Sequence, residues 1–574
     1  MENSTFENSA ASKIILGIDF GTSTSEIAYV NEQGKLVLVP NHLNEFITPS
    51  VVHIGESGTI TVGREAKERA LLEPECTFLE VKRLFGENAS LTAWGKSYSP
   101  VDIAAMIIEY LVECAETYLS LDLERAVITV PAYFTDAQRK DVIAAGEATG
   151  LIVERIINEP TAASLDYGVN HMDECKNILV YDLGGGTLDV TVLELFEGVV
   201  DVKSSCGNNE LGGKDFDKAI TDYICRNIKK KDKVDVTNDI RSMMRIKLAA
   251  EACKLELSVK EEYQVNLPFL SDENGNPASF SGSISRRDFE GMIRESVYST
   301  KTQIDMALAD ANVSAEEVDL VLLVGGSTRI PIVTEFLEEQ YGFSPESSVD
   351  ADLAVVRGAA IQAGVLSGML GEDAIVLTDI CPYSLSTAAL KLVGFGMDLR
   401  CDILIPRNTT LPAEFSKMYH TSADNQTSVH IRAYQGESEY PEENYLLNQF
   451  VLSGIPKARA GKENINIHFS YDLNGILKVS AEVVSTGKSA EITVDTSEVG
   501  ENMDLSEWKN ADAVSKYRKI INKADRLIKL HGEDADEVEV AVNELKKGLI
   551  LNWDDEILKS LEIDLDDAID SLSD

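Results

Sequence analysis

The chain has 574 residues and a formal net charge of −44 at pH 7, which argues against nucleic acids and anionic membranes as partners because phosphate groups are bound through clustered Lys and Arg. With 44% apolar and 26% charged residues it has the composition of a soluble multidomain protein, and none of its apolar stretches approaches the roughly 18–20 residues of a membrane span. Its eight cysteines form no C-x-x-C pair and its first residues do not resemble a signal peptide, so we expect a cytoplasmic protein without a zinc site or disulfide framework.

The first predicted elements are a strand, a glycine turn and a second strand over residues 13–30, after a tail, residues 1–12, that we expect to be disordered. The same order returns over residues 177–195. In both segments the first strand ends in an aspartate, Asp19 or Asp182, and the glycines allow backbone N–H groups to approach phosphate oxygens. The aspartate can hold a hydrated Mg²⁺ beside those phosphates. One such turn would be an ordinary hairpin, but a matched pair indicates two related lobes around one nucleotide.

Helices are expected in the same region. Ser99 and Asp102 form a capping box before a helix with apolar residues at helical spacing, and Thr135 opens a second helix. Residues 318–337 are typical of a buried strand, a Gly-Gly turn and a helix. Residues 13–370 therefore favour an α/β domain.

Two further regions follow this domain. The segment 371–379 is short and apolar at its centre, as expected of a linker, and residues 380–500 contain the short alternating strands of a compact all-β unit. Residues 501–574 are acidic and predicted to be helical. Their clearest apolar stripe comprises Ile520, Ile521, Ala524, Leu527 and Ile528.

Ten segments occur in a recognisable order along the chain: GIDFGTSTS, VKRLFG, VITVPAYFTDAQR, RIINEPTAAS, YDLGGGTLDV, NELGGKDFD, VGGSTRIP, RNTTLP, DNQTSVHIRAYQGE and DLNGILKVSA. Over about residues 13–500 this series resembles the heat shock protein 70 chaperones of the DnaK type. The resemblance implies an α/β actin-like two-lobed ATPase domain, an interdomain linker, an all-β peptide-binding sandwich and a short α-helical lid. It also implies an ATP hydrolase that binds unfolded or extended apolar peptides, with ATP hydrolysis and exchange controlling their binding and release.

The resemblance assigns the catalytic chemistry to five side chains. Asp19, Glu159 and Asp182 match carboxylates that bind Mg²⁺ largely through its waters. Lys82 matches the lysine that contacts the γ-phosphate and positions the attacking water, and Thr187 matches a residue that assists this water. Phosphoryl transfer to water is catalysed mostly by such positioning and charge stabilisation.

The other implied nucleotide contacts lie in two phosphate loops, an adenosine-binding helix and the loop facing it: Gly21, Thr22, Ser23, Thr24, Gly185, Gly186, Thr187, Gly212, Gly213, Glu251, Lys254, Ser258, Gly326, Ser327 and Arg329. The spacing of Glu251, Lys254 and Ser258 gives them one helix face, which would equally suit a charged surface helix. The implied cofactors are ATP or ADP, Mg²⁺ and K⁺.

Transmission between the domains is assigned by the resemblance to Pro131, Arg139, Arg155 and Asp379. From the sequence alone, Pro131 is equally well explained as the entry to a turn before a helix. The linker ends in Thr378, where the family usually has an apolar residue. We expect weaker docking there, because burial of a large aliphatic side chain contributes roughly 1.5–3 kcal/mol.

The peptide cleft is assigned by alignment to Leu390, Tyr419, Ser422, Val429, Ile431 and Ile465. An insertion around Lys391–Asp398 is expected to lengthen a loop before the next strand.

Gly532, Gly548 and Asn552 are expected to divide the short C-terminal lid into about three helical pieces. This short lid, together with the shortened span from Lys82 to Pro131 and VLTDICPYSL after the linker, resembles the HscC branch of specialised bacterial members. The implied partners are client polypeptides, a J-domain co-chaperone and a nucleotide exchange factor. Two alternatives stay open: a holdase that binds ATP without hydrolysing it, and a sugar or acetate kinase of the same ATPase superfamily. Intact Asp19 and Lys82 argue against the first, and the β-rich region argues against the second.

Overall fold

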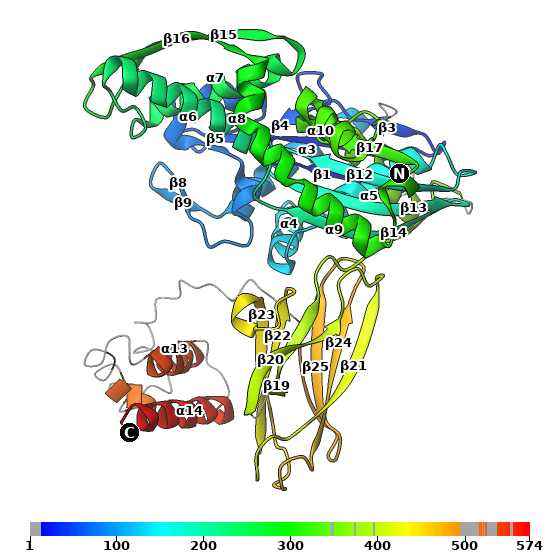
Figure 1. Ribbon diagram of the computed structural model, residues 1–574, viewed down its shortest axis with the longest axis vertical. Coiled ribbons are helices and arrows are strands. Elements are labelled where there is room, and N and C mark those ends of the chain that lie inside the picture. Colours follow the sequence, from blue (N-terminus) through cyan, green and yellow to red (C-terminus); the bar gives the residue numbers. More distant parts are fainter. Residues whose placement is uncertain are drawn as a thin grey trace, which may run out of the picture. The chain divides into compact units, whose positions relative to one another are not determined.

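The computed structural model describes residues 13–345, 349–371, 375–393, 396–493, 536–550 and 555–573, and parts of 516–528 (Figure 1). Contacts divide the chain into two units, one formed by residues 1–427 and 431–497 and one by residues 428–430 and 498–574. Each unit is described by itself. The predicted tail, residues 1–12, lies outside the described residues.

The first sheet of the large unit combines an antiparallel hairpin with parallel strands. In spatial order its strands are β11 (Ile152–Asn158), β10 (Arg125–Val130), β1 (Leu16–Phe20), β2 (Thr24–Val30) and β3 (Leu36–Leu38), with β4 (Thr48–Pro49) paired to β2. β1 runs parallel to β10 and antiparallel to β2. Leu16, Ile18 and Phe20 fill the core on one face, whereas Gly17 faces α11 (Ala354–Leu366), where an added Cβ would lie 2.3 Å from the Ala360 nitrogen. This close approach requires glycine.

The second sheet repeats this plan. Its strands are β17 (Leu320–Val324), β12 (Lys176–Leu183), β13 (Leu188–Phe196), β14 (Val199–Asn208) and β18 (Val376–Thr378). β12 and β13 form the antiparallel hairpin, and β17 adds to β12 in parallel. The repeated strand–turn–strand order of the sequence therefore belongs to two sheets of similar topology.

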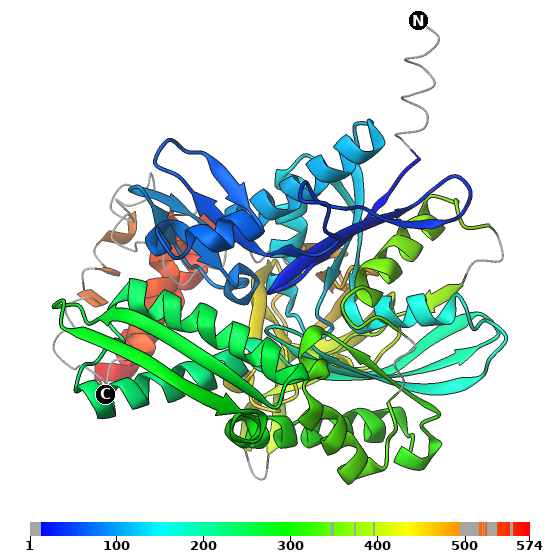
Figure 2. The same cartoon turned by 90° about the horizontal axis from the view of Figure 1, so that it is seen from above.

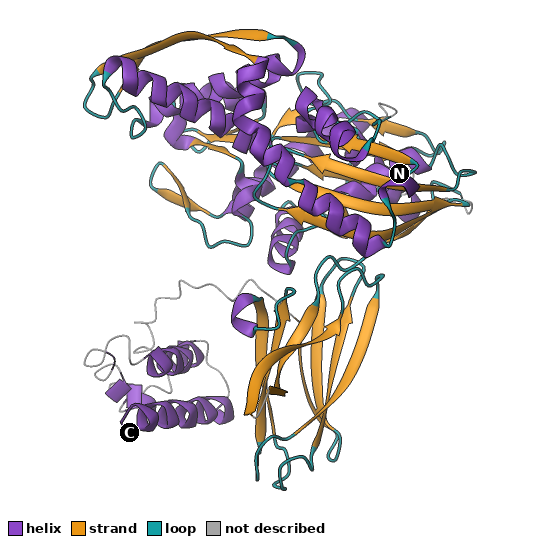
Figure 3. Cartoon of the chain, in the orientation of Figure 1, coloured by secondary structure: helices purple, strands orange, loops and turns teal. Residues whose placement is uncertain are grey.

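Helices pack on these two sheets and on the smaller strands beside them (Figure 3). Besides α11 they are α2 (Arg64–Arg69), α3 (Pro100–Leu119), α4 (Asp136–Ala148), α5 (Glu159–Gly168), α6 (Gly213–Asp232), α7 (Ile240–Val259), α8 (Arg286–Ser299), α9 (Lys301–Ala311) and α10 (Pro331–Tyr341). The predicted capping boxes are confirmed at both helices: Ser99 accepts from the Asp102 nitrogen before α3, and Thr135 accepts from the Gln138 nitrogen before α4. These caps satisfy backbone groups that have no partner inside the helix.

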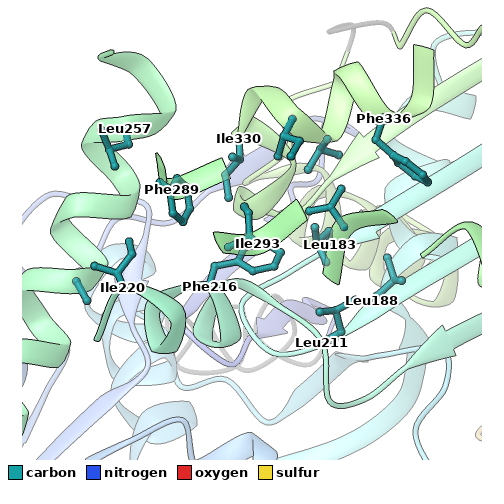
Figure 4. Close-up of a cluster of buried hydrophobic side chains, with 14 of the residues drawn as sticks. Leu183, Leu188, Leu211, Phe216, Ile220, Leu257, Phe289, Ile293, Ile330 and Phe336 are labelled. Carbon is teal, nitrogen blue, oxygen red and sulfur yellow. The ribbon is translucent and has the colours of Figure 1, made fainter. Parts of the chain in front are cut away.

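Smaller strands extend both lobes. They are β5 (Val51–Ile54), β6 (Ile60–Val62), β7 (Thr77–Leu79), β8 (Leu91–Ala93), β9 (Lys96–Tyr98), β15 (Glu262–Ser271) and β16 (Pro277–Ser285). The long β15–β16 hairpin lies along α6 and α7 (Figure 2). Below the hairpin, Phe216 of α6, Leu257 of α7 and Phe289 of α8 share one apolar cluster with residues of the second sheet (Figure 4).

The predicted all-β unit is a sandwich of two four-stranded antiparallel sheets. One contains β20 (Gly396–Ile405), β19 (Leu385–Val393), β22 (Ser428–Gln435) and β23 (Tyr445–Ser453). The other contains β21 (Ala413–His420), β24 (Asn464–Tyr471), β25 (Leu477–Val483) and β26 (Lys488–Thr493). The expected loop around Lys391–Asp398 is wrong, because Lys391 pairs with Asp398 and the insertion lengthens the β19–β20 hairpin.

The C-terminal unit contains α13 (Asp536–Ile550) and α14 (Asp555–Ser573). Ile521 and Ala524 of the predicted stripe are fully buried in its apolar cluster, and Leu527 lies outside the described residues. The expected break at Gly548 is wrong, since α13 continues through this residue; Gly532 and Asn552 also lie outside the described residues. In the described part of the chain, no helix has both the length and the apolar character to span a membrane.

Candidate nucleotide site and its link to the β-sandwich

The two predicted phosphate loops meet. A Cβ added at Gly185 would lie 2.2 Å from the Ser23 Oγ, and one added at Gly186 would lie 2.9 Å from the Thr22 side chain. Only glycine permits such an approach at both positions. Backbone groups of the two lobes are therefore close enough to contact one phosphate chain.

The two turns are held by different hydrogen bonds. In the second turn the Gly184 nitrogen donates to the Thr187 carbonyl at 3.0 Å. In the first turn a Cβ at Gly21 would lie 2.2 Å from the Thr24 carbonyl oxygen, and the Ser50 hydroxyl donates to the Gly21 carbonyl at 2.8 Å. The predicted loop residues are thus held in compact turns.

Asp19 and Asp182 are buried at the ends of β1 and β12. The Thr129 hydroxyl donates to Asp19 Oδ1 at 2.6 Å, whereas Asp182 Oδ2 is buried without a hydrogen-bond partner. Burial and the nearby Glu159 carboxylate together raise the pKa of Asp19 to about 7 and the pKa of Asp182 well above its usual range. Positive charge is in short supply at these two carboxylates.

Lys82 is the buried cation of this cluster. It stands in a short 3₁₀ helix, η2 (Val81–Leu84), and its Nζ donates to the Phe20 carbonyl at 2.5 Å and to Glu159 Oε1 at 2.6 Å. Because Phe20 follows Asp19 directly, these bonds bring together three of the five side chains predicted to be catalytic. Of the other two, Asp182 is buried at the end of β12 and Thr187 is buried in the second turn.

Sequence reasoning missed two acidic residues of the same cluster. Glu26 stands directly opposite Asp19 in the β1–β2 register, and Asp189 stands directly opposite Asp182 in the β12–β13 register. Both are buried. Their signal in the sequence was an acidic residue inside an otherwise apolar strand, at the same spacing from each turn aspartate.

The donor set suits a hydrated cation. Within the described residues, no three His, Cys, Asp or Glu groups are placed to hold a metal ion by themselves. Carboxylates arranged around glycine loops instead favour an ion that keeps several waters, as Mg²⁺ does. The unpartnered Asp182 Oδ2 is available to accept from such a water, so the residues present fit Mg²⁺.

Gly212 and Gly213 bring the start of α6 against the second turn. The Gly213 nitrogen donates to the Gly184 carbonyl at 3.0 Å, and a Cβ at Gly212 would lie 2.5 Å from the Gly186 nitrogen. The Lys214 nitrogen donates in the same way to the Gly185 carbonyl at 2.8 Å. The first N–H groups of α6 therefore hold the glycine turn in place.

Lys254 and Ser327 bind backbone carbonyls of the second glycine turn and of the start of α6. The Ser327 hydroxyl donates to the Gly184 carbonyl at 2.8 Å. Lys254 Nζ donates to the Gly213 carbonyl at 3.0 Å and pairs with Asp217 at 2.9 Å. Both predicted nucleotide contacts therefore also support the phosphate loop.

The remaining predicted nucleotide residues lie on the same side of the second lobe. Glu251 pairs with Lys67 of α2 at 2.5 Å, which connects the two lobes, and Ser258 donates to the Lys254 carbonyl at 3.0 Å. Gly326 begins the short 3₁₀ helix that ends in Arg329. Arg329 pairs with Asp352 at 2.6 Å and with Asp350 at 3.3 Å.

A buried hydrogen-bond chain leads from this site to the β-sandwich. Asn158, directly before Glu159, accepts from the Arg139 guanidinium at 2.8 Å. Its amide donates to both carboxylate oxygens of Asp379, at 2.8 and 2.9 Å. The Asp379 carbonyl in turn accepts from the Leu411 nitrogen at 2.8 Å. Two of the four predicted coupling residues, Arg139 and Asp379, are therefore joined through Asn158, which the resemblance to the family places on the face used by the linker.

Pro131 and Arg155 take different positions around this chain. The Pro131 carbonyl accepts from the Phe134 nitrogen at 3.2 Å, in a turn that Arg139 fastens by donating to Phe134 and Ala132 carbonyls. Arg155 Nε is buried without a hydrogen-bond partner. Burial lowers the pKa of Arg155, and the nearby Asp379 carboxylate opposes this shift. Arg155 thus contributes charge near Asp379 without a hydrogen bond to it.

The linker docks as a strand of the second sheet. β18 runs parallel to β14. Ile375, the residue before β18, is buried against Gly168, where an added Cβ would lie 2.7 Å from the Ile375 Cδ1. The Thr378 hydroxyl donates to Asp201 Oδ1 at 2.5 Å. This bond offsets part of the weaker docking expected for a hydroxyl at this position.

Two further contacts join the ATPase-like region to the sandwich. Arg407 pairs with Asp310 at 2.7 Å, and Asn408 donates to the same carboxylate at 3.1 Å. The Tyr383 hydroxyl donates to the Tyr133 carbonyl at 2.8 Å, and the two rings lie 4.3 Å apart. No local pattern in the sequence indicated these pairs.

The residues predicted for the peptide cleft are spread over both sheets and a loop. Tyr419 of β21 is the register partner of Ile465 of β24, and its hydroxyl donates to Asp402 at 2.8 Å. Ile465 and Ile431 are buried, whereas Leu390 of β19 is 47% exposed. Val429 lies in β22, and Ser422 lies in the loop after β21. The structure brings Tyr419 and Ile465 together, and their role in peptide binding stays a prediction.

Two similar sheets with facing glycine turns, followed by a docked linker and a β-sandwich, are the architecture of an actin-like ATPase coupled to a second domain. A model of the Hsp70 protein family matches residues 15–94 and 87–574. The chaperone protein DnaK of Thermotoga petrophila is 42% identical over 488 residues, which cover 84% of this chain and 80% of that protein. The DnaK proteins of Thermotoga maritima and Thermotoga neapolitana have the same identity and coverage. The chain belongs to the Hsp70 family.

Members of this family are ATP-hydrolysing chaperones that bind ATP or ADP with Mg²⁺, so the chain is a chaperone and an ATP hydrolase. The expected family, fold class and enzyme class are confirmed. Placement in the HscC branch stays a prediction.

Proposed function

We propose that this chain binds unfolded or extended apolar polypeptides in its β-sandwich and that ATP hydrolysis and exchange control their binding and release. The Asp379–Asn158–Arg139 chain carries this proposal. Asn158 is bonded to Asp379, the last residue of the linker, and its neighbour Glu159 is bonded to Lys82 in the nucleotide site. A change at the phosphates that moves Glu159 therefore acts on the position of Asp379 through two adjacent residues.

The nucleotide chemistry is assigned to the clustered side chains. Mg²⁺, held through its waters by Asp19, Glu159 and Asp182, would neutralise charge on the phosphates. Lys82 positions the γ-phosphate and the attacking water from a site rigidly defined by its bonds to Phe20 and Glu159. Thr187 orients the same water from the second turn. K⁺ is proposed as an additional cation, which the excess of buried carboxylates supports.

The partners follow from the family. The relatives named above support client polypeptides and co-chaperones, and we propose a J-domain protein and a nucleotide exchange factor among the latter. We also propose a cytoplasmic location, in keeping with the DnaK relatives.

The deciding experiment is ATP turnover with and without a short extended apolar peptide. We expect the peptide to raise the steady-state rate, because its binding alters the docked state of the sandwich. The control is an acidic peptide of the same length. Absent turnover would favour the holdase, and transfer of phosphate to a sugar or to acetate would favour the kinase.

A further inference from the structure

Glu26 is a buried carboxylate in the nucleotide site that the catalytic scheme above does not use. It lies in the middle of β2, is 2% exposed, and stands directly opposite Asp19 in the strand register. Residues that face each other in antiparallel strands project their side chains from the same face of the sheet. Glu26 and Asp19 therefore share one buried face at the mouth of the first hairpin.

The second hairpin carries the same arrangement. Asp182 stands opposite Asp189, and both lie in the same positions relative to their turn as Asp19 and Glu26 do in the first hairpin. Asp189 Oδ1 accepts from the Tyr133 nitrogen at 3.1 Å, while its Oδ2 is buried without a partner. Each lobe thus presents a cross-strand pair of carboxylates beside its phosphate loop.

Nothing in the described residues neutralises Glu26. Its Oε1 is buried without a hydrogen-bond partner, and the Thr24 hydroxyl is its one side-chain hydrogen-bonding neighbour among these residues. The charged groups facing it are Asp19, Asp352 and Glu159, all acidic.

The two basic groups of this neighbourhood are already engaged. Lys82 is bonded to Glu159 and to the Phe20 carbonyl, and Arg329 is paired with Asp352. Burial and the Asp19 carboxylate raise the pKa of Glu26 well above its usual range. A buried carboxylate with no cation beside it is destabilising, and a bound cation would remove this cost.

We propose that Glu26 is a further ligand, through water, of a divalent cation held at the nucleotide phosphates, so that the site uses one carboxylate pair from each lobe. The inference rests on the proposed nucleotide site and adds a residue to it. Water-mediated contact agrees with the lack of a direct metal cage and with the hydration that Mg²⁺ retains.

If Glu26 is such a ligand, nucleotide affinity depends more strongly on Mg²⁺ in the wild type than in a variant that lacks this carboxylate. With the metal, Glu26 helps to hold the ion beside the phosphates; without the metal, Glu26 adds nothing to nucleotide affinity. The measured quantity is the ratio of ADP affinity in Mg²⁺ to ADP affinity in EDTA, obtained by isothermal titration calorimetry on the full chain. In Glu26→Gln we expect this ratio to fall by about tenfold or more, equivalent to ~1.4 kcal/mol.

Glu290→Gln is the matched control, because Glu290 of α8 also has a buried oxygen without a partner but is not among the groups facing the nucleotide site. Its ratio should equal that of the wild type. Glu26→Asp keeps the charge and withdraws it by one methylene, so its ratio should lie between those of wild type and Glu26→Gln. This second variant keeps the test valid if Glu26→Gln does not fold.

An unchanged or increased ratio in Glu26→Gln, with a cooperative melting transition, would overturn the role of Glu26 and leave the proposed nucleotide site intact. If wild-type ADP affinity does not depend on Mg²⁺, both the proposed metal site and this inference are wrong. The assay uses neither peptide nor hydrolysis, so a failure of peptide stimulation has no bearing on it.

Discussion

The hairpins β1–β2 and β12–β13 contain the same kinds of residues around their turns, but different groups hold the two turns in place. Both place an aspartate before a glycine turn, a threonine after it and a second acid opposite the aspartate. The first hairpin is supported by Lys82, whose ammonium binds the Phe20 carbonyl. The second is supported by backbone, because Gly212 and Gly213 press the start of α6 against its turn.

This difference separates two tasks. A buried lysine places a charge at one point, whereas a turn of glycines lets an anion approach the backbone N–H groups closely. In the proposed function, the first hairpin would therefore act on the reacting phosphate, and the second would hold the phosphate chain.

The sheets of the two hairpins also reach the linker differently. The first sheet ends in β11, where Asn158 binds Asp379 through two hydrogen bonds to a buried carboxylate. The second sheet accepts β18 as an edge strand and adds the Thr378–Asp201 bond. The first link is buried and charged, and the second is mostly backbone pairing.

The largest effect is expected from the support of the first hairpin. Lys82→Ala should lower single-turnover ATP hydrolysis by ~10²-fold or more while ATP still binds, because positioning is most of the catalysis. Lys176→Ala, which removes a lysine paired with Glu174 outside the site, is the control. A wild-type rate in Lys82→Ala would show that the first hairpin needs no lysine for hydrolysis, and the two hairpins would then not differ in this way.

The next effect concerns the buried link of the first sheet. In Asp379→Asn we expect the stimulation of ATPase by peptide to disappear, with basal turnover and peptide affinity each near the wild-type value. Coupling is a difference between two states, so it can be lost while both sites stay intact.

The measurement is the ratio of turnover rates with and without peptide, and the control is Asp398→Asn, an exposed aspartate of β20. Normal stimulation in Asp379→Asn would mean that the linker strand alone transmits the signal.

A matched pair of substitutions compares the two turns directly. Thr187 and Thr24 stand at equivalent positions after their turns, but Thr187 is buried and Thr24 is exposed. Thr187→Ala should slow single-turnover hydrolysis ~10-fold, equivalent to ~1.4 kcal/mol, and Thr24→Ala should slow it less than ~3-fold. Equal effects would show that both turns orient the reacting water.

The smallest effect is expected at the linker of the second sheet. Thr378→Val loses one hydrogen bond, worth about 0.5–1.5 kcal/mol, and gains apolar surface of similar value. The peptide stimulation ratio should therefore change by less than ~3-fold. A tenfold gain would show that the hydroxyl weakens docking, as the sequence alone suggested, despite its bond to Asp201.

Local signals in the sequence sufficed for much of this molecule. The two strand–turn–strand segments, the capping boxes at Ser99 and Thr135 and the change to alternating strands were all predicted correctly, because each depends on residues close together in the chain. The family resemblance then named residues such as Lys82 and Glu159, whose bond spans distant segments and has no local signature.

The tertiary structure decided the contacts between distant segments. Strand register placed Glu26 opposite Asp19, extended the β19–β20 hairpin where a loop was expected, and gave Thr378 a partner in Asp201. A sequence lists the donors and acceptors but not the register that pairs them, and a shift of one residue turns every side chain to the opposite face. The number of carboxylates beside the glycine turns and the bonds that link them to the β-sandwich were therefore properties of the packed sheets alone.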